Sequence, residues 1–225
     1  LIIIVNRIIK RSISDNMQIK VDLKILIFAL IFFLTNQIKL YILLMIFAFT
    51  HEMAHLITGV CLGFKPSVLE IKPIGFSISF INPIVDYNKK ILKSNILELK
   101  KIIIYIAGPL INFILGMICF FKVDIMYINL LLAIINLISI YPLDGGRILK
   151  SALCIFCGRA KAYKITEVVS TISLSILLFG CSLLVLYAHN WGLVLIMVYL
   201  CYVKMQTSLY MKRRMELYNL IKKIK

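Results

Sequence analysis

Long apolar runs without charged residues dominate the chain and predict membrane helices. Such runs cover residues 25–38, 40–61, 102–121, 125–143 and 168–203. A helix needs roughly 20 mostly apolar residues to cross the hydrocarbon core of a bilayer. The last run is long enough for two short spans, and the turn-like sequence His189-Asn190-Trp191-Gly192 lies near its middle. We therefore expect about six transmembrane helices, the first of them short.

The segment between the second and third runs is too broken to be a span. Residues 67–83 alternate between polar and apolar in places, and prolines stand at Pro66, Pro73 and Pro83. We expect a re-entrant loop or a β-hairpin with an exposed edge here, and a plain cytoplasmic loop is the alternative. The predicted fold is an all-α polytopic membrane protein with a re-entrant loop or β-hairpin between spans 2 and 3.

Composition supports a membrane protein. Hydrophobic residues make up 61% of the chain and charged residues 16%, with a mean hydropathy of +0.96. A soluble domain is about half apolar and a quarter charged, so the soluble globular and disordered classes are both excluded. The six cysteines are scattered through apolar stretches, which is not the pattern of a secreted disulfide framework.

The excess of positive charge is explained by membrane topology. The chain has 26 Lys and Arg against 10 Asp and Glu, a net charge of +16. With the N-terminus inside, 24 of these 26 basic residues fall in cytoplasmic segments, and only Lys39 and Lys122 fall outside. We expect both termini in the cytoplasm, anionic lipid headgroups as the partner of these charges, and no nucleic acid.

The organisation follows from the runs and the charges. Residues 1–24 form a basic cytoplasmic segment, residues 25–203 the transmembrane domain, and residues 204–225 a basic tail. We expect the tail to be a short helix on the membrane surface. The chain begins with Leu1, which indicates either a fragment or an unusual start codon. Met17 would be a sensible initiator, so the two alternatives are a start at Leu1 and a start at Met17 that leaves out residues 1–16.

Three ionisable residues interrupt the second run in a metal-binding pattern. His51 and His55 are four residues apart, which puts both imidazoles on one face of a helix where they can bind one Zn²⁺. Glu52 stands beside them, in position to take a proton from a metal-bound water. The alternative is a pair of histidines hydrogen-bonded between helices. Each ionisable group in a span costs roughly 2.5–3.5 kcal/mol, which favours the metal.

A catalytic zinc usually has three protein ligands, so a third is expected. The candidates outside the motif are Asp144, His189, Asp124, Glu70 and the cysteines. Asp144 is favoured because it follows Pro142 at the cytoplasmic end of the fourth span, at the same side of the membrane as the histidines. The alternatives are a solvated Asp144 in an ordinary helix-terminating turn and a solvated loop histidine at His189.

Three motifs in order resemble the site-2 protease family of intramembrane zinc metalloproteases. The first is His51-Glu52-Met53-Ala54-His55, the second is residues 107–112 (Ala-Gly-Pro-Leu-Ile-Asn), and the third is residues 136–146, ending in Pro-Leu-Asp-Gly-Gly. Ser139 stands where the family usually has proline. The motifs lie within residues 50–147, nearly half of the chain.

The resemblance implies a metalloendopeptidase that hydrolyses a peptide bond in or near the membrane. It implies Zn²⁺ held by His51, His55 and Asp144, with Glu52 as the general base. It further implies substrate contacts by Asn136 and Pro142, and supporting roles for Gly108 and Asn112.

Within the family the chain resembles the sporulation branch. That resemblance implies regulated intramembrane proteolysis of a membrane-associated precursor, a pro-sigma factor of the pro-sigma-K type. It also implies a place in the outer forespore membrane and membrane inhibitor or scaffold partners. No nucleotide-binding CBS domain is expected within residues 204–225. The alternatives are a site-2 protease acting on an anti-sigma factor or peptide precursor, and a non-proteolytic metal-binding protein or transporter.

Overall fold

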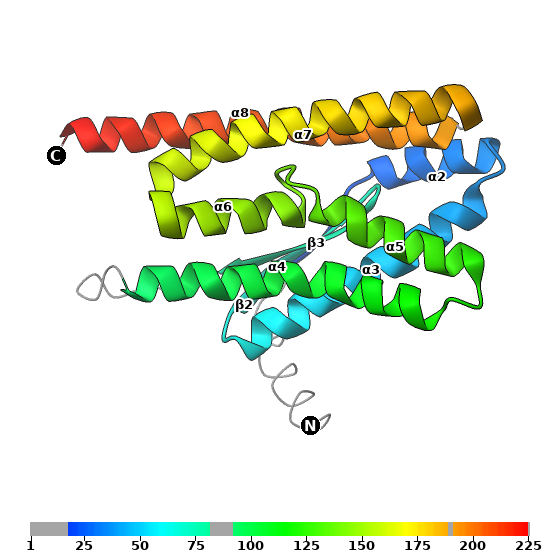
Figure 1. The fold of residues 1–225 in the computed structure, drawn as a ribbon, viewed down its shortest axis with the longest axis horizontal. Helices are drawn as coiled ribbons and strands as arrows, with labels where there is room; N and C mark the ends of the chain where they lie inside the picture. The colour runs from blue at the N-terminus through cyan, green and yellow to red at the C-terminus, as the bar shows by residue number, and fades with distance from the viewer. Residues whose placement is uncertain (1–17, 82–91, 189–190, 225) are drawn as a thin grey trace. The chain divides into compact units, whose positions relative to one another are not determined.

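The computed structural model describes residues 18–81, 92–188 and 191–224 (Figure 1). The elements follow one another as β1 (Gln18–Val21), α2 (Lys24–Leu34), α3 (Ile38–Cys61), β2 (Lys65–Lys72), β3 (Gly75–Ile81), α4 (Leu92–Ile118), α5 (Val123–Leu137), α6 (Asp144–Cys157), α7 (Arg159–Ala188) and α8 (Trp191–Ile224). The chain divides into two compact units, Leu1–Ile135 and Asn136–Lys225, and each is described by itself.

The first unit holds a small sheet packed on a long apolar helix. The strand order is β1-β2-β3, with β1 parallel to β2 and β2 antiparallel to β3. The sheet packs on α3, where the side chains of Leu56 and Val60 bury Ile78 of β3. The β2–β3 hairpin lies where the sequence predicts a re-entrant loop or hairpin, and Gly75, with φ of +127°, follows its turn.

The strand β1 is not predicted from the sequence. Its residues pair with β2 from Gln18 opposite Val68 to Val21 opposite Ile71, and all four are exposed. A four-residue strand has too few positions to show an alternating pattern, and its partner lies about fifty residues along the chain. The pairing places part of the predicted basic N-terminal segment in the sheet.

Three of the described helices are long and apolar enough to cross a membrane: Ile38–Cys61, Asn95–Ile118 and Arg159–Ser182. Two shorter apolar helices, Lys24–Leu34 and Val123–Leu137, coincide with the first and fourth predicted spans. Many large apolar side chains on these helices are exposed, as lipid-facing residues are, among them Leu30, Phe33, Phe113, Leu131 and Ile134. The count of six spans stays a prediction.

The second unit is helical throughout its described residues. The amphipathic helix α6 packs on α7, and α7 packs on α8. The helix α8 continues without a break from Trp191 to Ile224, so the basic tail extends the same helix that begins in the last apolar run (Figure 1). Residues 193–224 contain no glycine or proline, and nothing in the local sequence stops the hydrogen-bond ladder at residue 203.

Candidate metal centre

The helix α3 places two histidines and a glutamate in the interior of the first unit. His51, Glu52 and His55 are 6%, 7% and 3% exposed. One ligand atom from each of the three lies within 4.8 Å of the others. The imidazole rings are perpendicular, at 86°, with centroids 4.8 Å apart, and their Nε2 atoms are 3.1 Å apart. The helical spacing therefore brings both Nε2 atoms to one point, as the sequence predicts.

Residues of α4 contact the other ring nitrogen, Nδ1, of both His51 and His55. His55 Nδ1 lies 2.7 Å from the carbonyl oxygen of Ile104, which can only accept a hydrogen bond. Nδ1 of His55 therefore carries the proton, and Nε2 keeps a lone pair for a metal. His51 Nδ1 lies 3.2 Å from the side-chain amide of Asn112. Both hydrogen-bond partners therefore come from α4. Asn112 is the last residue of the Ala-Gly-Pro-x-x-Asn motif, and Ile104 lies three residues before that motif begins.

The amide of Asn112 is best assigned with its oxygen toward His51. Asn112 is fully buried, its Nδ2 faces His51 Nδ1, and its Oδ1 has no hydrogen-bond partner among the described residues. The oxygen and nitrogen ends of an amide have nearly the same size and shape, so the hydrogen-bond network decides which end faces His51. With the amide rotated by 180°, Oδ1 accepts a hydrogen bond from Nδ1–H of His51. Both histidines then present unprotonated Nε2 atoms together.

The two imidazoles fit a zinc ion. Zinc–nitrogen bonds of about 2.0–2.1 Å at tetrahedral angles place two ligand nitrogens roughly 3.3–3.4 Å apart. The Nε2 atoms of His51 and His55 are 3.1 Å apart and need only a slight separation to reach that spacing. Gly108 of α4 lies against the same atoms, and a Cβ there would overlap the Nε2 atoms of both rings. A glycine at this position is required for α4 to approach the pair.

Glu52 is oriented by the hairpin. The backbone N–H of Ile78 in β3 donates a hydrogen bond to Oε1 of Glu52. In the described sheet β3 pairs with β2 alone and is therefore an edge strand. Ile78 contributes through its backbone, for which a sequence offers no residue-type signal.

An apolar cavity of about 350 Å³ adjoins the motif within the first unit. It is lined by Tyr41, Ile42, Met45, Ile46, Phe49, Thr50 and Phe76. Thr50 directly precedes His51, and Phe76 lies two residues before Ile78 on β3. The cavity is open to the surface and can hold an apolar side chain beside Thr50 and Phe76.

The remaining predicted site residues belong to the second unit. Asn136 is the last residue but one of α5. Pro142 lies in the segment between α5 and α6, and Asp144 is the first residue of α6. Asp144 is 5% exposed, and its Oδ1 lies 4.0 Å from Nη1 of Arg147. A side chain at Gly145 would overlap backbone atoms of Leu137 and the residue after it. Coordination of the same metal by Asp144 stays a prediction.

The second unit also contains a lysine of α6 whose ammonium group lies over two aromatic rings. Nζ of Lys150 lies 4.8 Å from the ring centroid of Tyr141 and 4.3 Å from that of Tyr163. Burial disfavours the charged form of Lys150, but attraction to the two phenol groups outweighs it, and the pKa of Lys150 rises above its ordinary value. The lysine therefore stays protonated.

The other third-ligand candidates of the first unit lie on its surface. Asp124 is exposed in the first turn of α5, and Glu70 pairs with Lys72 at 3.2 Å. His189 falls outside the described residues. Across the described part of the chain, the grouping of three potential ligands that the structure brings together is His51, Glu52 and His55.

Three comparisons with known proteins agree with one another. Residues 123–180 match the model of Peptidase family M50. A zinc metalloprotease of Methanocaldococcus jannaschii is 32% identical over 201 residues, which are 83% of this chain and 53% of that protein. The solved structure of the site-2 protease from the same organism is 26% identical, with a TM-score of 0.62 over 86% of this chain and 92% of that one. The chain spans about half the length of the curated relative it matches.

Proposed function

We propose that this chain is a member of the site-2 protease family (peptidase family M50) and an intramembrane zinc metalloprotease that cleaves a membrane-associated protein. One observation carries the proposal. Two buried histidines on α3 bring their Nε2 atoms to 3.1 Å, and α4 holds both Nδ1 atoms, with Glu52 beside them. Such an arrangement of ionisable groups in an apolar helix is costly without a metal.

His51 and His55 hold the zinc through Nε2, and we propose Asp144 as the third ligand. Zinc in such a site supplies Lewis acidity, which lowers the pKa of a water ligand toward about 7 and polarises the substrate carbonyl. Glu52 takes a proton from the attacking water and delivers it to the leaving amine. The hydrogen bond from Ile78 fixes the direction of the Glu52 carboxylate for both transfers.

The substrate reaches the site as an extended strand. An intact helix hides its peptide groups, so the scissile segment must unwind before attack. The edge strand β3 offers backbone groups to such a strand, and its Ile78 already contacts Glu52. We propose that Asn136 and Pro142 contact the same segment.

The finer identity of the substrate follows from the resemblance to stage IV sporulation protein FB. On that basis the substrate is a pro-sigma factor of the pro-sigma-K type, the location is the outer forespore membrane, and membrane inhibitors or scaffolds are partners. Both termini are cytoplasmic, as the distribution of Lys and Arg indicates. A site-2 protease acting on an anti-sigma factor or peptide precursor shares the same chemistry, and timing of expression during sporulation separates the two.

The test replaces Glu52 with Gln in the full chain, co-expressed with a pro-sigma-type substrate. Zinc content and cleavage are both measured. The protease account expects the variant to keep its zinc and lose cleavage. A wild-type chain that binds zinc but cleaves neither pro-sigma, anti-sigma nor peptide precursors favours a transporter or scaffold instead.

A further inference from the structure

Polar side chains line the helix α7 in a stretch that is otherwise apolar. They are Thr166, Glu167, Ser170, Thr171, Ser173 and Ser175. Ser170 and Thr166 are 0% and 1% exposed, whereas Thr171 and Ser175 are exposed and bond only to carbonyls one turn back in their own helix. The buried hydroxyls therefore require an explanation that the exposed ones do not.

Ser170 reaches the turn that carries Asp144. Its Oγ accepts a hydrogen bond of 2.9 Å from the backbone N–H of Tyr141, three residues before Asp144. Inside the turn, Leu143 N–H donates to the carbonyl of Ile140 at 2.7 Å. The Ser170 hydroxyl is thus the link by which α7 holds a backbone group of this turn.

The start of α6 packs closely against the turn before it. A Cβ at Gly146 would lie 2.5 Å from the carbonyl carbon of Ile140, so the first turn of α6 rests directly on the backbone before it. Asp144 lies in the chain between these two contacts. We therefore expect a displacement of Tyr141 to move the Asp144 carboxylate as well.

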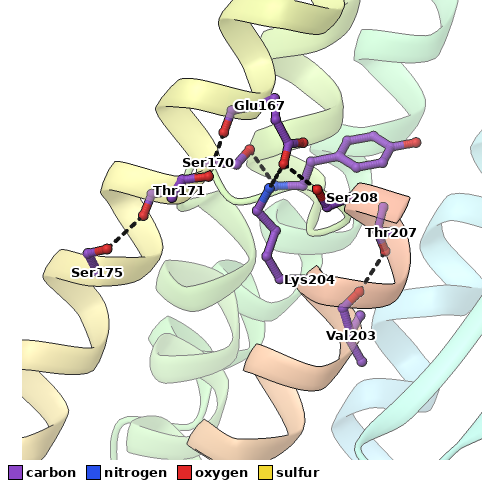
Figure 2. A network of polar contacts seen from close by, with 9 residues as sticks. Glu167, Ser170, Thr171, Ser175, Val203, Lys204, Thr207 and Ser208 are labelled. Carbon is purple, nitrogen blue, oxygen red and sulfur yellow. Dashed lines mark hydrogen bonds and ion pairs between the residues drawn. The ribbon is translucent and has the colours of Figure 1, made fainter. Parts of the chain in front are cut away.

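The helix α7 is itself held by α8 at the same level. Glu167 Oε1 accepts hydrogen bonds from Lys204 Nζ and from Ser208 Oγ, both at 2.7 Å (Figure 2). Lys204 is 7% exposed, and Glu167 lies one turn from Ser170 on α7. Figure 2 shows the Glu167 carboxylate joined by dashed lines to Lys204 and Ser208, with Ser170 on the same helix as Glu167.

We propose that Ser170 is a positioning residue that sets the direction of the Asp144 carboxylate toward the metal, with the Glu167–Lys204–Ser208 contact holding α7 in place. The inference rests on the proposed function through the assignment of Asp144 as third ligand. Residues that orient a ligand from outside the coordination sphere change metal affinity by about 10–100-fold when they are replaced.

The test uses the full chain in lipid nanodiscs, stripped of metal and titrated with Co²⁺, whose visible absorption reports ligand number and geometry. Three variants are compared with the wild type. Ser170→Ala removes the hydroxyl from Tyr141, Thr171→Ala removes a neighbouring hydroxyl that bonds only to its own helix, and Asp144→Asn is the reference for a lost ligand. Absorption maxima are read at saturating Co²⁺, so the folded fraction does not change them.

We expect Ser170→Ala to weaken Co²⁺ binding about tenfold or more and to shift the absorption maxima toward those of Asp144→Asn, while Thr171→Ala matches the wild type. A Ser170→Ala spectrum and affinity equal to the wild type, beside an altered Asp144→Asn, overturns the inference and leaves the proposed function standing. An Asp144→Asn spectrum equal to the wild type refutes Asp144 as a ligand. If Ser170→Ala does not fold, Ser170→Cys replaces it, because the thiol is a weaker hydrogen-bond acceptor of similar size. We expect Ser170→Cys to bind Co²⁺ several-fold more weakly than the wild type. Wild-type affinity in Ser170→Cys also overturns the inference.

Discussion

Replacing Asn112 with Leu tests how α4 prepares the histidines for the metal. The leucine has a similar branched shape but cannot accept a hydrogen bond, so Nδ1–H of His51 loses its partner in a fully buried place. A buried donor left without a partner costs about 1–3 kcal/mol. The histidine avoids this cost by turning its ring or moving the proton to Nε2, and either change weakens zinc binding.

The expected result is a loss of zinc affinity by a factor of about 10–100. Asn112→Asp keeps an oxygen toward His51 and is expected to stay within a few-fold of the wild type. Asn129→Leu is the matched control, because Asn129 is also fully buried but its Nδ2 bonds to the carbonyl of Ile125 in its own helix. Affinity is measured by competition with a chromophoric chelator. Equal losses in Asn112→Leu and Asn129→Leu, or wild-type affinity in Asn112→Leu, would refute the reasoning.

Three further variants test other parts of the account. Gly108→Ala should abolish stoichiometric zinc, because its Cβ would overlap both imidazoles. Gly116→Ala should keep the metal, because a Cβ there meets the side chain of Leu130 and, at an ordinary contact distance, the carbonyl oxygen of Met126. The zinc content of the purified proteins distinguishes the two variants. Lys204→Met should lower the free energy of unfolding by about 1–3 kcal/mol, because it leaves the partly buried Glu167 without its cation, and denaturant titration should show it. Ile78→Pro should impair cleavage without loss of zinc, because it removes the N–H that donates a hydrogen bond to Glu52, the proposed base. Edge strands accept proline, so the sheet should still form. Full cleavage activity in this variant would contradict the orienting role of the Ile78 amide.

The sequence is sufficient for the parts of the site that depend on local periodicity. The spacing of His51 and His55 fixes one helical face, and the structure brings their Nε2 atoms together as predicted. The broken, alternating segment after α3 predicts a re-entrant loop or a β-hairpin, with a plain loop as the alternative, and the structure forms the β2–β3 hairpin there.

Contacts between distant segments are not visible in a single sequence. The parallel pairing of β1 with β2, the approach of Asn112 to His51 and the hydrogen bond from Ile78 to Glu52 all join residues far apart in the chain. The last of these uses a backbone group that every residue except proline has. The sequence predicts a separate short helix for residues 204–225, whereas α8 runs unbroken through them. The reason is that a change from apolar to basic composition marks a membrane boundary without ending a helix.

The most direct test of the central claim is the zinc X-ray absorption spectrum of the full chain, purified with its metal. The account predicts one zinc per chain with nitrogen and oxygen ligands at about 2.0–2.2 Å and a two-imidazole scattering pattern that disappears in His51→Ala. A sulfur shell at about 2.3 Å, or an imidazole pattern unchanged by that substitution, would contradict it.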